Sequence, residues 1–324
     1  MRTAFEASLS IGDVTFHLVS EDRRLAPAAD GLLRPFFVDP RRADVEIRAR
    51  WTDTPAELGG DVLFDSGPPW QLFQSGNEFL FTFRSANGGP VPYKTARFNQ
   101  TFTIGDVQLY RPHFDHQSSD FRGVRLEPNR VNPLDFPLNE LLMIHVLSQG
   151  KGVEVHGCAL VDAAGRAYVF PGQSGAGKST LARLWSEHPG VRLLSDERVV
   201  VRTDRQPIVV YGTPWHGDAR VVSPQSGQLA GVFFLHHAAT HAVVPTSRSL
   251  AAAQLLACSF LPFHSAKAVE RTMAAVEQAT RAAPCYDLWF APDASVIDVL
   301  AKYMPAAPFD ARLRRARSSG GGPA

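Results

Sequence analysis

The chain has 324 residues, of which 44% are hydrophobic and 20% charged, a composition that fits a folded protein of about two domains and excludes a disordered chain. Its 33 basic and 32 acidic residues leave a formal net charge of +1, so the bulk charge predicts neither a nucleic-acid partner nor a membrane partner. The cysteines Cys158, Cys258 and Cys285 lack CxxC spacing, which argues against a disulfide framework or a zinc site and favours a cytoplasmic location.

Polar residues interrupt both segments that would have to be apolar in a secreted or membrane protein. Glu6 and Asp13 fall where a signal peptide needs an apolar run. The longest mostly apolar stretch, residues 250–263, contains Gln254 and Pro262 and is shorter than the roughly 20 residues of a spanning helix. We therefore predict neither a secretion signal nor a membrane span.

The first part of the chain alternates apolar and polar residues with a period of two. The segments SLSIGDVTFHLV, VEIRARW, EFLFTFR and FTIGDVQLY are separated by Gly, Pro, Asn and Asp, the pattern of antiparallel strands and turns. A Pro- and Asn-rich stretch follows, and then residues 139–149 have the spacing of a short helix that ends at Gly150. This predicts a β-rich domain over residues 1–135, with a boundary near 130–138.

The second part mixes strand and helix signals. Apolar strands are expected over 153–162 and 166–172, a helix over 179–187 and a strand over 191–201. Residues 226–228, Ser-Gly-Gln, are expected to form a turn. Further on come the strands GVFFL and YDLWF, an Ala-rich helical stretch over 249–282 broken at Pro262, and a last helix over 295–303. We predict the α/β fold class for a domain over residues 136–310, and a flexible tail over 311–324.

A phosphate-binding loop is the most specific motif of the chain. Residues 172–179 satisfy G-x-x-x-x-G-K-[ST] and lie between a predicted strand and a predicted helix, where main-chain N–H groups and the positive end of the helix dipole hold polyphosphate. We predict that Lys178 reaches the β and γ phosphates of ATP and that Ser179 binds Mg²⁺. The predicted nucleotide-binding residues are Gly172, Gln173, Ser174, Gly175, Ala176, Gly177, Lys178, Ser179 and Thr180. The alternative is a flexible glycine loop without a ligand.

Two adjacent acids follow the loop. Asp196 and Glu197 lie within the apolar segment RLLSDERVVV, and in P-loop proteins a second strand commonly supplies a carboxylate that faces the metal. In a regular strand the two side chains point to opposite faces, so only one faces the site unless the backbone bends. The alternative is that both are surface charges.

The segments HGCALVDAAGRAYVFPGQSGAGKSTLARLW and VRLLSDERVVV resemble the core of the bacterial HPr kinase/phosphorylase family, whose P-loop is related to that of ATP-dependent phosphoenolpyruvate carboxykinase. The resemblance covers about residues 138–235. It implies a P-loop core of this type, bound ATP and Mg²⁺, phosphorylation of a serine on a protein, and a homo-oligomer. It also implies that Asp196 is the general base, that His156 matches the family histidine, and that Glu197 stands at a metal-binding position where the family has aspartate.

Two further features of the sequence bear on this resemblance. Thr180 replaces a common glutamate, and a later signature linked to phosphorolysis is missing, so we predict the kinase reaction alone. The loop GTPWHGDAR displays His216, Asp218 and Arg220, which we expect to orient phosphate, metal or acceptor, unless the loop is merely closed by a packed tryptophan. His156 is equally well read as a hydrogen-bonded core residue.

The sequence thus predicts an ATP-dependent kinase that transfers the γ-phosphate to a hydroxyl, expected to be a serine of a protein or peptide. The alternatives are a nucleotide-binding regulator, with the β-rich part as its partner module, and a phosphoenolpyruvate carboxykinase. Carboxykinase activity would need additional arginine and metal ligands that we do not identify. No motif indicates the acceptor.

Overall fold

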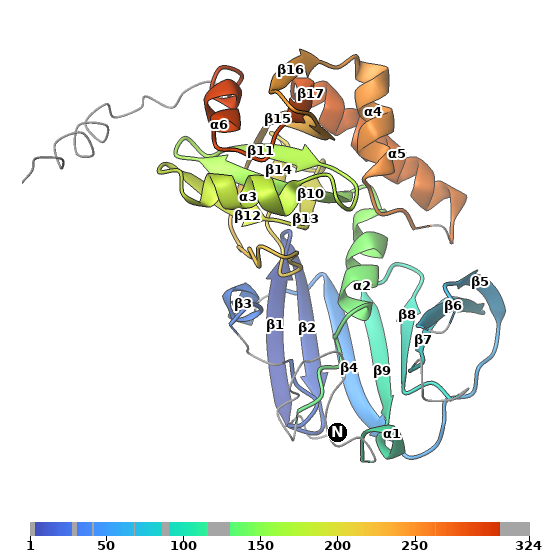
Figure 1. Cartoon of the computed structure of the whole chain (residues 1–324). Coiled ribbons are helices and arrows are strands. Elements are labelled where there is room, and N and C mark those ends of the chain that lie inside the picture. The colour runs from blue at the N-terminus through green and yellow to red at the C-terminus, as the bar shows by residue number, and fades with distance from the viewer. Residues whose placement is uncertain are drawn as a thin grey trace, which may run out of the picture.

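A computed structural model describes residues 4–27, 31–40, 42–67, 69–85, 91–115, 130–262 and 264–304. The predicted tail over 311–324 lies outside these ranges. Figure 1 shows two large sheets, one formed by the N-terminal part of the chain and one by the C-terminal part, with a helix between them. Strands account for 40% and helices for 21% of the described residues. Each helix in these ranges is too short or too polar to serve as a membrane span.

The N-terminal sheet has nine strands in the order β3-β1-β2-β4-β9-β8-β7-β6-β5. The pairs β2–β4 and β4–β9 are parallel and the remaining pairs are antiparallel. The strands are β1 (Phe5–Ile11), β2 (Val14–Ser20), β3 (Phe37–Val38), β4 (Val45–Thr52), β5 (Asp61–Asp65), β6 (Trp70–Ser75), β7 (Glu78–Phe83), β8 (Lys94–Asn99) and β9 (Ile104–Tyr110). A short 3₁₀ helix, Arg34–Phe36, precedes β3, and α1 (Arg111–Asp115) follows β9.

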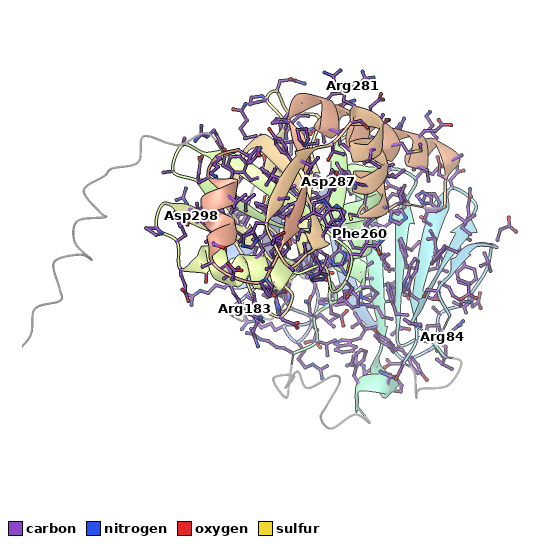
Figure 2. All side chains as sticks on the ribbon, turned by 45° about the horizontal axis from the view of Figure 1, so that its top comes forward. Arg84, Arg183, Phe260, Arg281, Asp287 and Asp298 are labelled. Atoms are coloured by element: carbon purple, nitrogen blue, oxygen red, sulfur yellow. The ribbon has the colours of Figure 1, made fainter. Side chains whose placement is uncertain are left out.

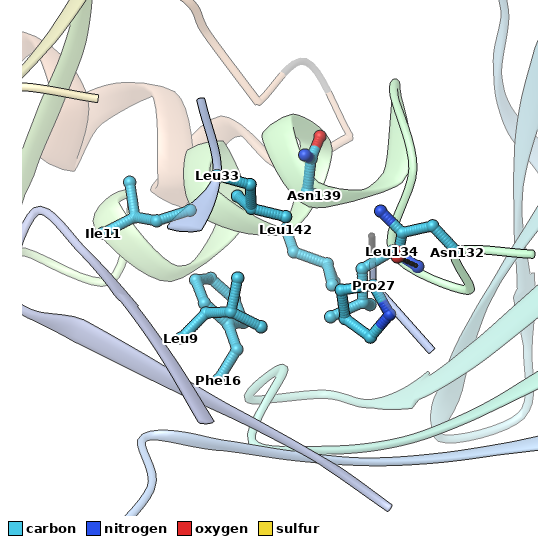
Figure 3. A pocket seen from close by; sticks show the side chains of 9 residues that line it. All are labelled: Leu9, Ile11, Phe16, Pro27, Leu33, Asn132, Leu134, Asn139 and Leu142. Atoms are coloured by element: carbon cyan, nitrogen blue, oxygen red, sulfur yellow. Dashed lines mark hydrogen bonds between the residues drawn. The ribbon is translucent and has the colours of Figure 1, made fainter. Parts of the chain in front are cut away.

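The alternation seen in the sequence places one face of this sheet in a core. In β4, Val45, Ile47 and Ala49 are buried while the residues between them are exposed. Helix α2 (Leu138–Leu147) packs on this face, and nearly all of its residues are buried. Where α2 meets the β1–β2 hairpin, Figure 3 shows a small apolar hollow. Its lining residues are Leu9, Ile11, Phe16, Pro27, Leu33, Asn132, Leu134, Asn139 and Leu142.

The C-terminal sheet has eight strands, along the path β11-β10-β13-β14-β15-β17-β16, with β12 paired to β10 and β11 also paired to β15. The last pairing closes β10, β13, β14, β15 and β11 into a ring of strands. The strands are β10 (Gly152–Asp162), β11 (Arg166–Pro171), β12 (Val191–Ser195), β13 (Arg198–Arg202), β14 (Val209–Tyr211), β15 (Ser226–His237), β16 (Ala242–Pro245) and β17 (Cys285–Phe290).

The α/β fold class expected from the sequence, with a P-loop core like that of HPr kinase and phosphoenolpyruvate carboxykinase, is wrong. The protein is mostly β and has two large mixed sheets. In the C-terminal sheet only β11–β15 and β15–β17 are parallel. The reason lies in the connections, because parallel neighbours need a crossover of a dozen or more residues. The connection β10–β11 is instead a tight turn, which makes β11 antiparallel to β10. Strands β12 and β13 follow one another along β10 with a bend at residues 196–197, and both are antiparallel to it.

Helices cover both faces of this sheet. Helices α4 (Arg248–Ala257) and α5 (Ala266–Ala282) pack on the face that carries Val155 and Val232. Helices α3 (Lys178–Ser186) and α6 (Ser295–Leu300) pack on the opposite face, against Phe233 and Phe290. The helix predicted over 179–187 and the two helices predicted on either side of Pro262 therefore form, although the sheet they cover is not the expected one.

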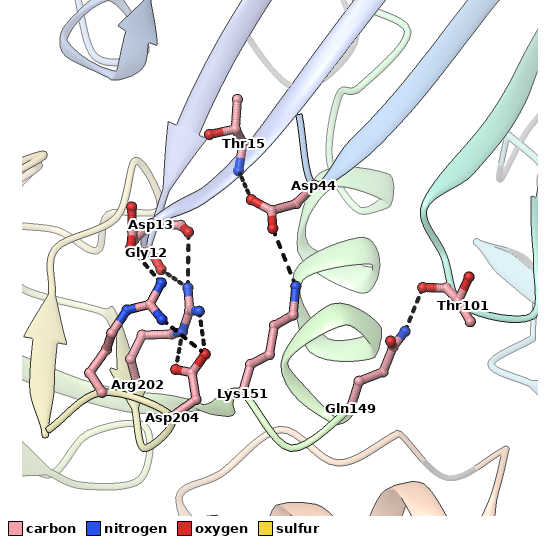
Figure 4. A network of polar contacts seen from close by, with 10 residues as sticks. Gly12, Asp13, Thr15, Asp44, Thr101, Gln149, Lys151, Arg202 and Asp204 are labelled. Atoms are coloured by element: carbon pink, nitrogen blue, oxygen red, sulfur yellow. Dashed lines mark hydrogen bonds and ion pairs between the residues drawn. The ribbon is translucent and has the colours of Figure 1, made fainter. Parts of the chain in front are cut away.

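Polar contacts join the two sheets at the turn of the β1–β2 hairpin, as Figure 4 shows. Arg202 Nη1 donates to the carbonyls of Gly12 and Asp13 at 2.8 and 3.0 Å, and its side chain is almost fully buried. Lys151 Nζ lies 3.4 Å from Asp44 Oδ1. A Cβ on Gly12 would lie 2.7 Å from Val200 Cγ1. The hairpin turn therefore fits closely on β13, the strand that follows Asp196 and Glu197.

Candidate functional site

The predicted phosphate loop connects the end of β11 at Pro171 to the start of α3 at Lys178. Gly175 and Gly177 have φ values of 84° and 97°, in the left-handed region that favours glycine. A Cβ on Gly172 would lie 2.8 Å from Ala176 Cβ, which explains why this position also needs glycine. The loop thus has the strand–loop–helix context of the motif, and the first N–H groups of α3 point out of the helix toward it.

Lys178 folds its side chain back over the loop. Its ammonium donates to the carbonyls of Gly172 and Gln173 at 3.0 and 3.1 Å, and the residue is only 5% exposed. Burial lowers the pKa of Lys178, and the charge of Glu197 acts in the opposite direction. An ammonium has three N–H donors, so these two carbonyls leave one donor for a phosphate oxygen.

Asp196 lies in the turn between β12 and β13 and has no solvent exposure. Its Oδ1 accepts the main-chain N–H groups of Gly217 and Val221, both at 3.1 Å, and its Oδ2 accepts that of Ala219 at 2.8 Å. The Ser179 hydroxyl lies 3.4 Å from Oδ2. Asp196 therefore links the loop formed by residues 217–221 to the start of α3.

Glu197 has a different environment. Its Oε1 lies 3.2 Å from His156 Nε2, and both side chains are partly exposed. The hydrogen bond from His156 is the main reason why the pKa of Glu197 is lowered, so this carboxylate is ionised at neutral pH. The main chain of β10 positions both groups, since His156 lies on β10 and Gly157 N donates to the Glu197 carbonyl at 3.0 Å.

Oxygen atoms of three predicted site residues converge beside Gly217. A Cβ built on Gly217 would lie 2.9 Å from Asp196 Oδ2, 3.0 Å from Glu197 Oε2 and 3.3 Å from Ser179 Oγ. The absent side chain leaves a space bounded by two carboxylates and a hydroxyl. In the described ranges no group of three or more His, Cys, Asp and Glu side chains forms a metal-binding arrangement. The set here contains two such residues and a serine.

The structure brings most of the predicted site residues together. Lys178, Ser179, Asp196, Glu197 and His156 surround the N-terminal end of α3, and both acids face this region because the backbone bends at the β12–β13 turn. The other predicted nucleotide-binding residues lie in the loop between β11 and α3 or at the start of α3. Three of them are exposed: Gln173, Ser174 and Gly175.

The residues singled out in GTPWHGDAR behave differently. Asp218 and Arg220 are exposed, and Arg220 has a φ of 54°, a left-handed conformation that is uncommon outside glycine. The His216 ring donates from Nδ1 to the carbonyl of Gly217 at 2.9 Å. Trp215 packs against the N-terminal core, as expected for a loop closed by a tryptophan. Gly217, in the same loop, lies against both acids, a contact that the sequence pattern does not reveal.

No protein-family model matches this chain, and no curated protein matches it.

Proposed function

We propose that this protein is an ATP-dependent kinase that transfers the γ-phosphate to a hydroxyl, with a serine of a protein or peptide as the acceptor. The observation that carries the proposal is the approach of Asp196 and Glu197 to Ser179 at the start of α3, next to a complete phosphate loop. Phosphoryl transfer needs a polyphosphate cradle, charge neutralisation and a carboxylate near the acceptor. The resemblance to the HPr kinase/phosphorylase family supports the same reaction, and the three free cysteines support a cytoplasmic location.

The residues present fit a Mg²⁺ ion. Ser179 Oγ and Asp196 Oδ2 lie close together at the start of α3 and would hold the ion. In phosphate sites Mg²⁺ is commonly bound by one or two protein oxygens together with phosphates and water. Bound Mg²⁺ would neutralise charge on the β and γ phosphates. The three main-chain amides on Asp196 keep its carboxylate oriented for this role.

The proton of the acceptor hydroxyl needs a carboxylate with a free oxygen. The resemblance implies that Asp196 is this base. In the structure, however, Asp196 is fully buried and both of its oxygens accept main-chain amides. Glu197 Oε1 is held by His156, and its Oε2 faces the space beside Gly217. We therefore assign proton removal to Glu197 and the orientation of its carboxylate to His156.

Glu197→Gln is expected to lower γ-phosphate transfer by about 10²- to 10⁴-fold while Mg·ATP binding stays close to that of the wild type. Asp196→Asn is expected to weaken Mg·ATP binding, because an amide group cannot accept three N–H donors. Transfer of labelled γ-phosphate to serine peptides, with matched alanine peptides as controls, and calorimetry measure both effects. Full transfer by Glu197→Gln would refute this base assignment, and ATP binding without any transfer by the wild type would favour the regulator.

Gly217→Ala is expected to weaken Mg²⁺-dependent ATP binding by about 10-fold or more, because a methyl group would contact Asp196 Oδ2, Glu197 Oε2 and Ser179 Oγ. Gly59→Ala is the matched control, since nothing lies within 4 Å of a Cβ there. Titration with Mg²⁺ at fixed ATP separates the metal from the nucleotide. An unchanged Mg²⁺ dependence in Gly217→Ala would mean that the ion is not held at this place.

A further inference from the structure

The direction of a bound nucleotide follows from where the acids lie. Strand β11, which leads into the phosphate loop, has β10 on one side and β15 on the other. Asp196 and Glu197 lie beyond β10, in the β12–β13 turn, and the γ-phosphate has to face them for transfer. The α-phosphate and the nucleoside therefore leave the loop on its other side, over the carboxyl ends of β15 and β17.

These strand ends touch the phosphate loop directly. His237, the last residue of β15, donates from Nε2 to the carbonyl of Gly175 at 2.6 Å. Phe290, the last residue of β17, packs against the loop so closely that a Cβ on Gly177 would lie 2.7 Å from its Cζ. His236 and Trp289 precede these residues on the two strands, so their side chains point to the other face of the sheet, beside the same carboxyl ends. A nucleoside that crosses the edge of the sheet at these strand ends would reach them.

Those neighbours form an aromatic pair at the sheet edge. His236 and Trp289 are cross-strand partners, and their rings stack with centroids 4.4 Å apart at 21°. The cluster around Asp287, which is labelled in Figure 2, fixes the histidine: Asp287 Oδ1 accepts from His236 Nε2 at 2.8 Å and from Gln254 Nε2 at 2.9 Å. The imidazole therefore holds the indole on one face in a defined orientation.

The other flank of Trp289 is open. Its partner on β16 is Ala242, an exposed residue whose methyl group is too small to cover an indole. Trp289 is 42% exposed, although it is one of the largest apolar side chains. An exposed, rigidly held indole beside the carboxyl ends of the strands that contact the loop has the properties of a stacking platform for an aromatic base.

We propose that the purine base of the nucleotide stacks on Trp289, so that the carboxyl ends of β15 and β17 form the nucleoside subsite. This inference rests on the proposed function, because it needs the triphosphate on the loop. His236 and Asp287 act as positioning residues that orient the indole. The subsite gives a preference for purine nucleoside triphosphates over the bare triphosphate chain.

Calorimetry of Trp289→Leu with Mg·ATP and with Mg·tripolyphosphate tests the subsite. Stacking on an aromatic side chain predicts that affinity for Mg·ATP falls about 10-fold and that affinity for Mg·tripolyphosphate is unchanged. Phe136→Leu is the control, because Phe136 is an exposed aromatic residue that precedes α2 and is not part of the C-terminal sheet. In the wild type, ATP should quench tryptophan fluorescence more than tripolyphosphate does, and Trp289→Leu should remove that difference.

The outcomes separate this inference from the proposed function. Equal affinities of Trp289→Leu and the wild type for Mg·ATP would overturn the stacking subsite and leave the phosphate loop intact. A parallel loss of affinity for both probes would also overturn it, since the indole would then support the loop and not the base. Failure of the wild type to bind either probe would overturn the proposed function as well.

Discussion

Lys178→Met is expected to lower γ-phosphate transfer by about 10²- to 10³-fold or more and to weaken Mg·ATP binding, because it removes the cation closest to the phosphate loop. The ammonium lies over the loop through its bonds to the Gly172 and Gln173 carbonyls. Methionine keeps the length and much of the volume of the buried side chain, so the loss is one of charge and hydrogen bonding.

Two measurements make this expectation specific to the site. Lys267→Met, on the exposed surface of α5, removes the same charge elsewhere and should leave transfer and binding unchanged. Thermal unfolding of both variants tests whether the loss of the lysine disturbs the start of α3. A Lys178→Met chain that folds and transfers phosphate at the wild-type rate would remove the phosphate loop from the mechanism.

The conformation of the glycine loop before α3 and many strands were predictable because their signals are local. The G-x-x-x-x-G-K-[ST] spacing fixes the loop by itself, and the period of two in segments such as β4 follows from one buried face. The fold class was not predictable in this way. Strand pairing in the C-terminal sheet depends on which residues meet across the ring of strands, and alternating strand and helix signals do not distinguish that ring from a sheet built with parallel crossovers.

Two local errors have the same origin. The segment Ser226-Gly227-Gln228 was expected to form a turn, yet it begins β15 and pairs with β14. Its glycine is needed because a Cβ there would lie 2.6 Å from Val161 Cγ2, a contact that no local pattern reveals. In the same way, the role of Gly217 depends on acids 20 and 21 residues earlier in the chain, which only the folded backbone brings near.

Acidification is expected to destabilise the protein through one buried and one partly buried histidine. His145 on α2 and His264 before α5 have ring centroids 4.5 Å apart, and the rings of Phe81 and Phe102 pack against His145. Burial lowers the pKa of His145 to about 3 and that of His264 to about 4. Neither His145 Nε2 nor His264 Nδ1 has a hydrogen-bond partner among the described residues. Both rings are therefore neutral in the folded protein at neutral pH.

The sign follows from proton binding. Below about pH 6.5 the histidines of the unfolded chain take up protons while the folded ones do not, so stability falls as the pH falls toward 4. Each fully buried histidine contributes up to about 1.4 kcal/mol per pH unit, and the partly exposed His264 contributes less. Glu154 opposes this trend, because burial raises its pKa and the folded protein then holds a proton that the unfolded chain has lost above pH 4.5. The fully buried His145 alone contributes a loss of roughly 2 kcal/mol between pH 6.5 and 4.5.

His145→Phe isolates the histidine part of this loss. A phenyl ring fits the aromatic surroundings and cannot be protonated, so the variant should lose about 2 kcal/mol less stability than the wild type over the same pH range. Urea unfolding at several pH values between 7 and 4.5 measures the slope, and His188→Phe, after α3 and outside this cluster, serves as the matched control. Parallel slopes for wild type and His145→Phe would show that the ring is already protonated in the folded protein, or solvated enough to titrate as it does in the unfolded chain.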